Sequence, residues 1–516
     1  MNLPGTSVSV WLDTTEGTKE GTKYPQLTSD ITVDVAIVGG GITGLTAALL
    51  LKQAGLRVAV IEASRIGNGV TGYTTAHLTE AADERYQDLI SSLGDADAKL
   101  VAESSRAAIE RIAKFVAEEK IDCDFQRVPG YLYTEKSQDV SEIESEAEAA
   151  SKLVIPAALT KDVPLPFPVE VAMMFPNQAQ FNPIPYLQGL AKAIDGSGSF
   201  IFEQSSVVDI TGDKPSRVST EQGTVTALDV IIATHTPIHN LNSLPDLYVM
   251  STKIAPYRSY VIGVRLRSPL PEGLFWDTEE PYHYTRSYKD LLIVGGEDHK
   301  TGEDVDNQAC FERLEAYARD RFDVQSIDYH WSAQLYEPVD GLPYIGQTAA
   351  HSNIYVATGY SGNGMTFGTV GGMLTSDLIL GRTNPWSELY DPNRANILAS
   401  AQRFVTENLG VAKHFVVDRL FKSEGNEPSD VAPGEGKILE IDGKKYAVYR
   451  DETDYLCSLS PVCTHAGCIV DWNNAEKTWD CPCHGGRFSP TGEVLNGPPI
   501  TDLDQKELPS QVTTKS

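Results

Sequence analysis

A chain of 516 residues is too long for a single hydrophobic core, so we expect two or three domains. Its 41% hydrophobic and 22% charged residues are typical of a soluble globular protein, and the N-terminal residues show no export signal, so we expect a cytoplasmic protein. The net charge of −29 disfavours nucleic acids and anionic membranes as partners.

The first strongly patterned stretch, which follows a polar N-terminal arm, is typical of dinucleotide binding. Residues 34–38 form a buried-strand run, residues 39–44 read GGGITG and open an apolar helix, and a second strand at 57–61 ends at Glu62. The glycines permit a tight turn and close approach to a pyrophosphate at the helix N-terminus. Glu62 can accept hydrogen bonds from ribose hydroxyls and would repel a 2′-phosphate, which disfavours NADP.

Three later segments are candidates to complete this nucleotide site. Residues 67–77 read GNGVTGYTTAH and offer N–H groups and hydroxyls to phosphates or a ring edge, although an ordinary connector stays open. Residues 231–234 read IIAT, as in a strand that returns to a nucleotide domain. Residues 359–368 read GYSGNGMTFG after a strand, but no second strand ending in an acid follows, which argues against a separate NADH site.

Together these stretches resemble the D-amino-acid oxidase, glycine oxidase and sarcosine oxidase superfamily of flavoenzymes. The resemblance covers residues 30–385 and rests on VAIVGGGITG with Glu62, on IIAT, and on DGLPYIG followed by NIYVATGYSGNGMTFG. It implies FAD and an α/β FAD-binding, Rossmann-like domain in three parts, with an inserted antiparallel-sheet substrate domain. The implied FAD-binding parts are residues 30–120, 175–245 and 337–385, and the implied substrate-domain parts are residues 121–174 and 246–336.

The resemblance also implies which residues contact the cofactor and the substrate. The expected FAD-binding residues are Gly39, Gly41, Ile42, Thr43, Gly44, Glu62, Ala63, Arg65, Gly72, Thr74, Thr75, Ala76, His77, Val208, Ala233, Thr234, Gly359, Gly362, Asn363, Gly364, Met365 and Thr366. Family members oxidise a C–N bond of a small molecule by hydride transfer to the flavin. The candidates for the substrate pocket are His77, Tyr282, His283 and Arg286, and for His283 and Arg286 a purely structural role stays equally open. No catalytic residue is identified.

Two departures from the family pattern bear on the chemistry. Sarcosine-oxidase-like members carry a lysine associated with oxygen reduction in the strand before their Gly pair, whereas residues 291–294 contain none. Members that act on amino acids hold the carboxylate with basic residues near the flavin, whereas residues 365–367 offer none and the 67–77 loop offers only His77. We therefore expect oxygen to be a poor electron acceptor, and both an amine and an amino acid stay open as substrates.

The C-terminal part has a different character. The sequence predicts that the FAD-dependent unit extends over residues 1–422, with helix over 387–422, that residues 423–436 are a polar linker, and that residues 437–508 form a small all-β domain. Two ligand clusters lie in this domain, Cys463-Thr-His465 and Cys481-Pro-Cys-His484. Two Cys and two His are what a Rieske [2Fe–2S] centre needs. The alternative is zinc, which takes the same set but does not call for a second Cys pair.

The CTHAGC and CPCHG contexts resemble the Rieske family, in the subtype with a disulfide between the two loops, which here implies Cys468–Cys483. High-potential respiratory members follow their CPCHG with a Ser and, two residues later, a Tyr. Both hydroxyls donate hydrogen bonds to sulfur and raise the reduction potential. Gly486 and Phe488 occupy those positions here, so we expect a lower potential.

The whole chain thus resembles bacterial FAD-dependent oxidoreductases fused to a C-terminal Rieske domain. We expect an enzyme that oxidises an amine or amino acid and passes electrons from the reduced flavin to the in-chain cluster, and then to an unidentified redox partner. Two alternatives stay open. In one, electrons flow in reverse, from the cluster through the flavin to a substrate, and in the other the protein is a redox carrier or sensor without turnover.

Overall fold

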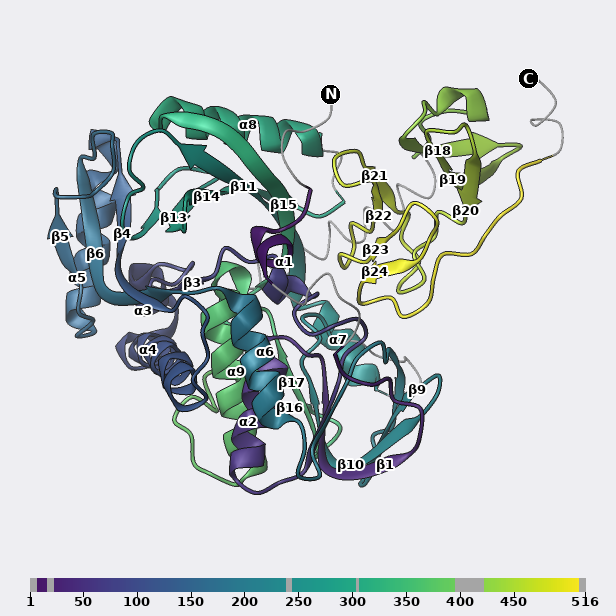
Figure 1. Ribbon diagram of the computed structural model, residues 1–516, viewed down its shortest axis with the longest axis horizontal. Helices are drawn as coiled ribbons and strands as arrows, with labels where there is room; N and C mark the ends of the chain where they lie inside the picture. The colour runs from purple at the N-terminus through teal and green to yellow at the C-terminus, as the bar shows by residue number, and fades with distance from the viewer. Residues whose placement is uncertain (1–6, 16–22, 238–243, 303–305, 395–421, 510–516) are drawn as a thin grey trace.

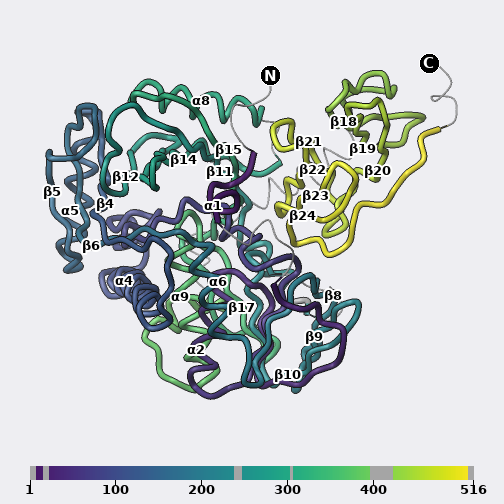
Figure 2. Tube along the Cα trace, viewed as in Figure 1, coloured from purple at the N-terminus to yellow at the C-terminus, as the bar shows by residue number. Residues whose placement is uncertain are grey.

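The computed structural model describes residues 7–15, 23–237, 244–302, 306–394 and 422–509. A large body contains two sheets, and a smaller β domain, drawn in green and yellow, lies beside it (Figure 1). Segments far apart in the sequence meet within the large body. In Figure 2 the purple strand near the start of the chain runs beside teal strands, because β1 pairs with β10 in a parallel arrangement.

The first sheet has the order β16-β17-β10-β1-β2-β7, with β8 and β9 as an antiparallel extension of β10. Its strands are β16 (Tyr344–Gln347), β17 (Ile354–Thr358), β10 (Thr224–Ile232), β1 (Ile31–Val38), β2 (Val58–Ile61), β7 (Phe200–Phe202), β8 (Val207–Ile210) and β9 (Ser216–Thr220). Val35 and Ile37 of β1 pack in the core that holds α2 (Ile42–Gln53) and α6 (Pro183–Ile194). Because both faces of β1 are covered, its sequence is an almost unbroken apolar run.

The second sheet has the order β15-β11-β14-β13-β12-β4-β6-β3, with β5 beside β6. Its strands are β15 (Val324–Pro338), β11 (Ile254–Leu266), β14 (Leu291–Lys300), β13 (His283–Tyr288), β12 (Leu274–Trp276), β4 (Gln126–Thr134), β6 (Val171–Gln180), β3 (His77–Leu78) and β5 (Ala158–Thr160). All pairs are antiparallel except β12 with β4. The predicted fold class, an FAD-binding α/β domain with an inserted and largely antiparallel sheet, is confirmed.

Helices cover the two sheets. They are α1 (Val10–Thr14), α3 (Tyr86–Leu93), α4 (Asp95–Glu118), α5 (Val140–Lys152), α7 (Pro245–Ser251), α8 (Asn307–Arg321) and α9 (Gly364–Ile379), besides α2 and α6. On β11, Tyr260 and Ile262 pack in the core under α8. The intervening Ser259 and Val261 lie on the opposite face, since side chains alternate along a strand. None of the helices in the described ranges is long and apolar enough to cross a membrane.

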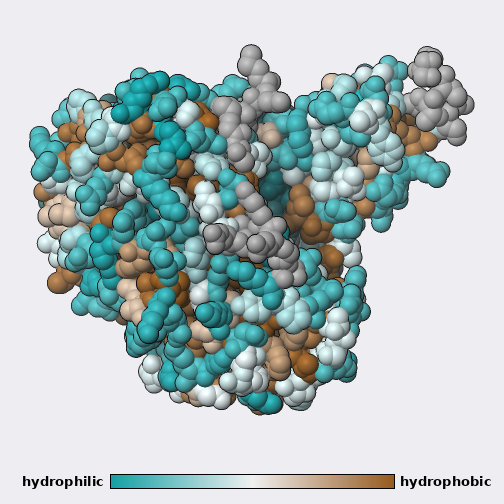
Figure 3. Space-filling view, viewed as in Figure 1, coloured by the Kyte–Doolittle hydropathy of each residue, from teal (hydrophilic) through white to brown (hydrophobic). Residues whose placement is uncertain are grey.

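The small domain contains two antiparallel sheets. The first consists of β18 (Glu435–Ile441), β19 (Lys444–Arg450) and β20 (Leu456–Leu459), and the second of β21 (Asp471–Asn473), β22 (Thr478–Asp480), β23 (Arg487–Phe488) and β24 (Val494–Asn496). Part of the predicted linker contacts this domain, because Glu424 N–H donates to Ile438 O (2.8 Å) and Glu440 N–H donates to Gly425 O (2.9 Å). In Figure 3 the domain stands out from the body as a separate lobe.

The helix predicted over residues 387–422 is wrong for residues 387–394, which form turns, and residues 395–421 lie outside the described ranges. The physical reason is the buried ion pair of Arg394 with Asp340, at 2.6 Å. Arg394 also donates to the carbonyl oxygens of Leu342 and Pro343. These contacts hold the segment against the DGLP turn at residues 340–343 and leave no room for a regular helix.

The small domain is joined to the large body by Glu476, in the turn between β21 and β22. Its carboxylate accepts hydrogen bonds from Arg258 Nε (2.8 Å) and Ser332 Oγ (2.5 Å) of the large body, and from Arg487 Nη2 (3.0 Å) of its own domain. Arg258 is only 2% exposed. Burial alone would raise the pKa of Glu476, but the charges of Arg258 and Arg487 outweigh it and lower the pKa to about 2. The carboxylate is therefore ionised at neutral pH.

We expect Glu476→Gln to destabilise this contact by about 3 kcal/mol or more, because it leaves the Arg258 guanidinium buried without its counter-charge. The measurement is denaturant unfolding followed through the visible absorption of the cluster. In the wild type this stabilisation is present above the pKa of an unfolded glutamate and is lost as pH falls towards 2.

Glu435→Gln is the matched control, because Glu435 forms an exposed ion pair with Lys477 in the same domain (3.0 Å). Its loss should cost less than about 1 kcal/mol. Equal destabilisation by the two variants would show that the Glu476 contacts do not hold the domains together.

Candidate functional site

One cavity of about 790 Å³ extends through the large body to the small domain. Its walls are the β1–α2 turn, the 67–77 loop, the inner faces of β11, β13 and β15, the start of α9, and a loop of the small domain at 494–502. Three parts of the chain that are far apart in sequence therefore form a single site.

The glycine end of the cavity is shaped to receive a phosphate group. Gly39 has φ +109°, and a Cβ built on it would lie 2.4 Å from the carbonyl oxygen of Ala233. A Cβ on Gly44 would lie 2.0 Å from the carbonyl oxygen of Gly39. No other residue fits at these two positions, so the backbone of the β1–α2 turn can approach a ligand closely. At the start of α2 the Ile42 N–H donates to Thr71 Oγ1 (3.3 Å), which lies in the wall of the same cavity. The cradle thus fits the pyrophosphate of a dinucleotide.

Glu62 lies at the end of β2, beside the glycine cradle. Its carboxylate oxygens accept hydrogen bonds from the N–H groups of Gly40 (2.7 Å) and Ser64 (2.9 Å). Burial raises the pKa of Glu62, and these donors oppose the rise. The side chain is therefore fixed at the edge of the cavity, where a ribose hydroxyl could donate to its remaining lone pairs.

Most of the residues expected to bind FAD line this cavity. They are Gly39, Gly41, Ile42, Thr43, Glu62, Ala63, Thr74, Thr75, His77, Val208, Ala233, Thr234, Gly362, Asn363, Gly364 and Met365. The structure places Gly44, Gly72, Ala76, Gly359 and Thr366 behind this lining. Arg65 instead lines a separate surface cleft beside Lys23 and Glu203.

Of the four candidates for the substrate pocket, His77 and Tyr282 line the cavity. His77 makes ring-nitrogen contacts with Thr75 Oγ1 (3.0 Å) and the carbonyl oxygen of Thr285 (3.3 Å). Burial and the nearby charge of Arg286 lower the pKa of His77 to about 3. The imidazole is therefore neutral at physiological pH, and it can exchange hydrogen bonds but cannot supply a positive charge.

The other two candidates have structural positions. His283 points to the opposite face of β13, where it stacks on Tyr317 of α8 (3.8 Å between centroids) and bonds Asp277 (3.0 Å). Burial disfavours the protonated imidazolium of His283, but the hydrogen bonds to Asp277 and Glu297 outweigh this effect and raise the pKa of His283 to about 9. Arg286 is 1% exposed and donates to the carbonyl oxygens of three residues, Thr75, Ala76 and Phe181. It thereby shapes the 67–77 loop from behind.

Sequence reasoning missed several residues of the cavity wall. Tyr284, Trp276 and Ser259 lie beside His77 and Tyr282, and the Tyr284 and Ser259 hydroxyls are 2.6 Å apart. The period-two pattern of β13 could have found Tyr284, since it places Tyr282 and Tyr284 on one face and His283 on the other. Nothing local marks Asp83, which reaches the cavity only through the tertiary fold.

The short helix α1 also supports the cavity from outside. Trp11 Nε1 donates to the carbonyl oxygen of Thr74 (2.6 Å), and Ser9 Oγ donates to that of Gly72 (2.5 Å). Trp11 is completely buried. A segment that the sequence indicated only as a polar arm therefore fixes the 67–77 loop.

The second site lies in two loops of the small domain that share one backbone pattern. In the first loop, Cys463 N–H donates to Cys468 O (2.8 Å) and Gly467 N–H donates to Cys463 O (3.0 Å). In the second loop, Cys481 N–H donates to the carbonyl of the residue five positions on (2.7 Å), and Gly485 N–H donates back to Cys481 O (3.0 Å). The two loops thus present equivalent pairs of ligands to one another.

The side chains of these loops match a Rieske ligand set. The imidazole rings of His465 and His484 lie 4.8 Å apart at an interplanar angle of 88°. Their Nδ1 atoms are buried and make no hydrogen bond within the described part of the chain. The thiols of Cys463 and Cys481 are buried and reduced. Two sulfur and two imidazole nitrogen atoms are therefore available to hold a [2Fe–2S] centre.

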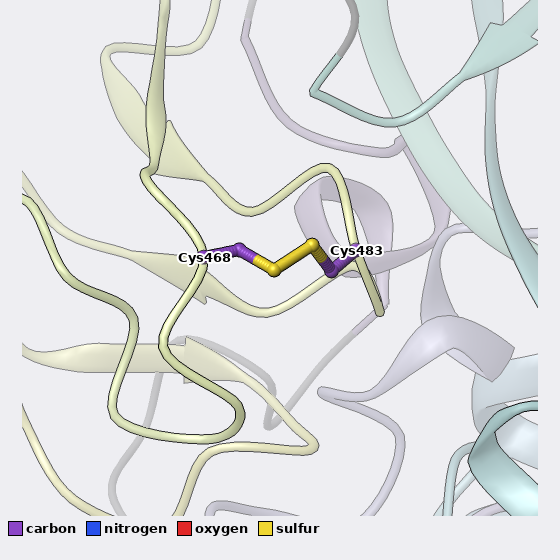
Figure 4. The surroundings of a disulfide bond; sticks show 2 residues. All are labelled: Cys468 and Cys483. Atoms are coloured by element: carbon purple, nitrogen blue, oxygen red, sulfur yellow. A yellow bond between two sulfur atoms is a disulfide. The ribbon is translucent and has the colours of Figure 1, made fainter. Parts of the chain in front are cut away.

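The predicted Cys468–Cys483 disulfide is present and ties the two loops together (Figure 4). The sulfur atoms of Cys468, Cys481 and Cys483 lie within 4.8 Å of one another, as in a three-sulfur metal site. Two of them are consumed by the disulfide, however, so they cannot act as thiolate ligands. Cys463 and Cys481, by contrast, keep free thiols that could bind iron.

The cluster loops contact the wall of the cavity directly. Tyr336 Oη donates to the carbonyl oxygen of His484 (3.0 Å), and Gln334 Nε2 donates to that of Gly485 (2.9 Å). Gln334 and Tyr336 both line the cavity from β15. On the other side of the loops, the ring of Tyr248 lies 5.9 Å from that of His465. Gln334 and Tyr336 thus contact the cavity on one side and, on the other, the backbone of His484, a candidate ligand of the cluster, and its neighbour.

Comparisons with known proteins agree with both sites. The model of a family described as FAD dependent oxidoreductase matches residues 34–378, and that of the Rieske [2Fe-2S] domain matches residues 425–508. A Bacillus subtilis protein described as a putative Rieske 2Fe-2S iron-sulfur protein, YhfW, is 37% identical over 94% of this chain and 95% of its own length.

Two further proteins are similar to only part of this chain. Gamma-glutamylputrescine oxidoreductase of Escherichia coli is 28% identical over 69% of this chain and 86% of its own length. The crystal structure of glycine oxidase from Geobacillus kaustophilus superimposes with a TM-score of 0.60 at 20% identity, over 70% of this chain and 99% of that one. The latter supports the fold of the large body.

We expect Gly486→Ser to raise the reduction potential of the cluster. A Cβ at residue 486 would lie 3.6 Å from Cys463 Sγ, so a hydroxyl there can donate to sulfur and stabilise the reduced state. The same Cβ would lie 2.8 Å from the ring of Pro499, which must shift. Gly486→Ala imposes that shift without the hydroxyl and is the control. Redox titration should show a rise for Ser alone, and equal potentials in the two variants would contradict this.

Proposed function

We propose that this chain, which belongs to the FAD dependent oxidoreductase family and carries a Rieske [2Fe-2S] domain, oxidises a C–N bond in a small amine or amino acid. We propose further that the electrons pass to the cluster in the same chain. The protein is an oxidoreductase that binds FAD and a [2Fe–2S] cluster. Bound FAD supplies two-electron acceptance of a hydride, and the Rieske centre supplies acceptance of one electron at a time.

The proposed reaction balances with these two cofactors and one external acceptor. The α-carbon of the neutral amine gives up a hydride, and the nitrogen lone pair forms the C=N bond of an iminium product. Bound FAD would pass the two electrons on singly to the cluster and release the accompanying proton to solvent, and an external one-electron partner would accept each electron. The curated relative named gamma-glutamylputrescine oxidoreductase supports an amine as substrate.

The observation that carries the proposal is the contact of Gln334 and Tyr336 with the cluster loop. Both residues line the cavity and both donate hydrogen bonds to backbone carbonyls of the ligand-bearing segment 484–485. Electron transfer weakens steeply with distance, so direct packing of the two sites favours transfer within one chain. His235 braces this layer, because its Nε2 lies 3.1 Å from the carbonyl oxygen of Gln334.

The chain's own residues would bind and orient the substrate. Tyr282, Tyr284 and Trp276 form an aromatic wall that limits access of water. His77 lies against this wall, with its ring 5.5 Å from Trp276 and 5.8 Å from Tyr284. Because its pKa is lowered to about 3, His77 adds polarity without charge. A neutral substrate amine would therefore need no cationic partner from this wall.

We expect that anaerobic addition of a substrate, found by screening amines and amino acids, bleaches the flavin first and then reduces the cluster. Tyr336→Phe removes the hydrogen bond to His484 and should slow the second phase several-fold while leaving the first unchanged. Stopped-flow absorbance separates the two phases, and electron paramagnetic resonance identifies the reduced cluster.

Tyr133→Phe is the control, because it removes a buried hydroxyl contact with Tyr317 (3.0 Å) that is remote from the cluster. A cluster that stays oxidised while the flavin bleaches would contradict transfer within the chain. Rapid release of peroxide in air, at a rate that does not change when the cluster is lost, would also contradict transfer within the chain. Reduction of the flavin only after an external donor has filled the cluster would instead establish reverse flow.

A further inference from the structure

The cavity wall has an uneven distribution of charge. The ionisable acidic side chains that line it are Glu62, Asp83, Glu221 and Asp502, whereas no Lys or Arg among the described residues does so. Arg286 lies near His77, but its guanidinium is buried behind the 67–77 loop and is engaged by backbone carbonyls. A substrate carboxylate would thus find no cationic partner in the described wall. A substrate cation would find the carboxylate of Asp83, since Glu62 lies at the glycine end of the cavity.

Asp83 is the acid nearest the aromatic wall. It is fixed from two sides, because the Gly362 N–H donates to its carboxylate and its own N–H donates to Asn363 Oδ1 (2.9 Å). A Cβ built on Gly362 would lie 2.9 Å from Asp83 Oδ2 and 3.0 Å from Tyr282 Oη. The carboxylate and the tyrosine hydroxyl therefore converge on the same point of the cavity.

The surroundings of Asp83 leave its negative charge poorly compensated. Asp83 keeps exposed surface. Loss of hydration beside the cavity wall raises the pKa of its carboxyl to about 6, although the Gly362 N–H and the charge of Arg85 oppose the rise. Arg85 lies 3.9 Å from Glu142, and it is not part of the cavity wall. Burial and repulsion from Asp83 also raise the pKa of Asp298 to about 7. A cation in the cavity would relieve this repulsion.

We propose that this cavity selects alkylammonium compounds that lack a carboxylate, with Asp83 and the Tyr282 hydroxyl holding the cation and Tyr284 and Trp276 contacting its alkyl groups. Carboxylate oxygens together with aromatic faces are the usual partners of organic cations in proteins. The inference rests on the proposed function, since it names the class of amine that the site admits. The bound ammonium gives one proton to the Asp83 carboxylate, and the neutral amine that results is the form that is oxidised. Amino acids are excluded because their carboxylate would be buried beside acids without a counter-charge.

The test uses the full-length protein with both cofactors and two unreactive probes of opposite charge. n-Butyltrimethylammonium has no nitrogen lone pair and butanoate has no C–N bond, so neither can be oxidised by the proposed reaction. Binding is measured as perturbation of the visible absorption of the oxidised flavin. We expect saturable binding of the cation and none of butanoate. Comparable binding of the two would overturn the inference without depending on any variant.

Asp83→Asn should weaken binding of n-butyltrimethylammonium about tenfold or more, because the amide can still accept from Gly362 but carries no charge. Asp88→Asn, on the exposed surface of α3, removes one charge without touching the cavity and is the control. Flavin content and melting temperature are measured first for both variants. Equal weakening by the two substitutions would overturn the role of Asp83.

Turnover with n-butylamine, 1,4-diaminobutane and 4-aminobutanoate separates this inference from the function on which it rests. Faster anaerobic bleaching by 4-aminobutanoate than by the two carboxylate-free amines would overturn the selectivity and leave C–N oxidation intact. Selective binding of n-butyltrimethylammonium without bleaching by any amine would uphold the selectivity and contradict C–N oxidation.

Discussion

The carboxylate of Glu476 is the interaction on which the arrangement of the two domains depends. A guanidinium as buried as that of Arg258 is stable only with a paired negative charge, and within the described ranges Glu476 of the small domain supplies that charge. The small domain therefore completes the electrostatics of the large one. The same contact brings the loops of Cys463 and Cys481 against β15, where Gln334 and Tyr336 fix the carbonyls of residues 484 and 485.

Strand alternation then decides which side chains reach the cavity. On β15, Gln334 and Tyr336 point inward, and on β13 Tyr282 and Tyr284 do the same. His283, between the two tyrosines, is held on the far face by Asp277 and Tyr317. A single strand thus contributes aromatic groups to the site and a structural ion pair to the packing of α8. Asp83 and the neutral His77 lie among the polar groups beside the aromatic wall.

Much of the site could be predicted from sequence because its features are local. The glycine cradle, Glu62 and the two Cys–His clusters each lie within short stretches whose backbone geometry depends on residue type. For His283 and Arg286 the sequence left a place in the substrate pocket and a purely structural role equally open, and burial and hydrogen bonding give both residues structural contacts. Asp83, Tyr336 and Glu476 depend on contacts across 144 to 280 residues, which no local pattern encodes. The helix predicted for residues 387–394 was wrong for a similar reason, because Arg394 pairs with Asp340, which is distant in sequence.

Helix α1 has a consequence for the order in which the protein is assembled. Trp11 holds the 67–77 loop, and Asp13 accepts a hydrogen bond from Tyr329 across 316 residues of sequence. During synthesis, the contacts of Ser9 and Trp11 with the 67–77 loop can form as soon as that loop has emerged, but the contact of Asp13 must wait until β15 has followed. The support that α1 gives to the loop is therefore completed late, and long-range contacts of this kind slow folding.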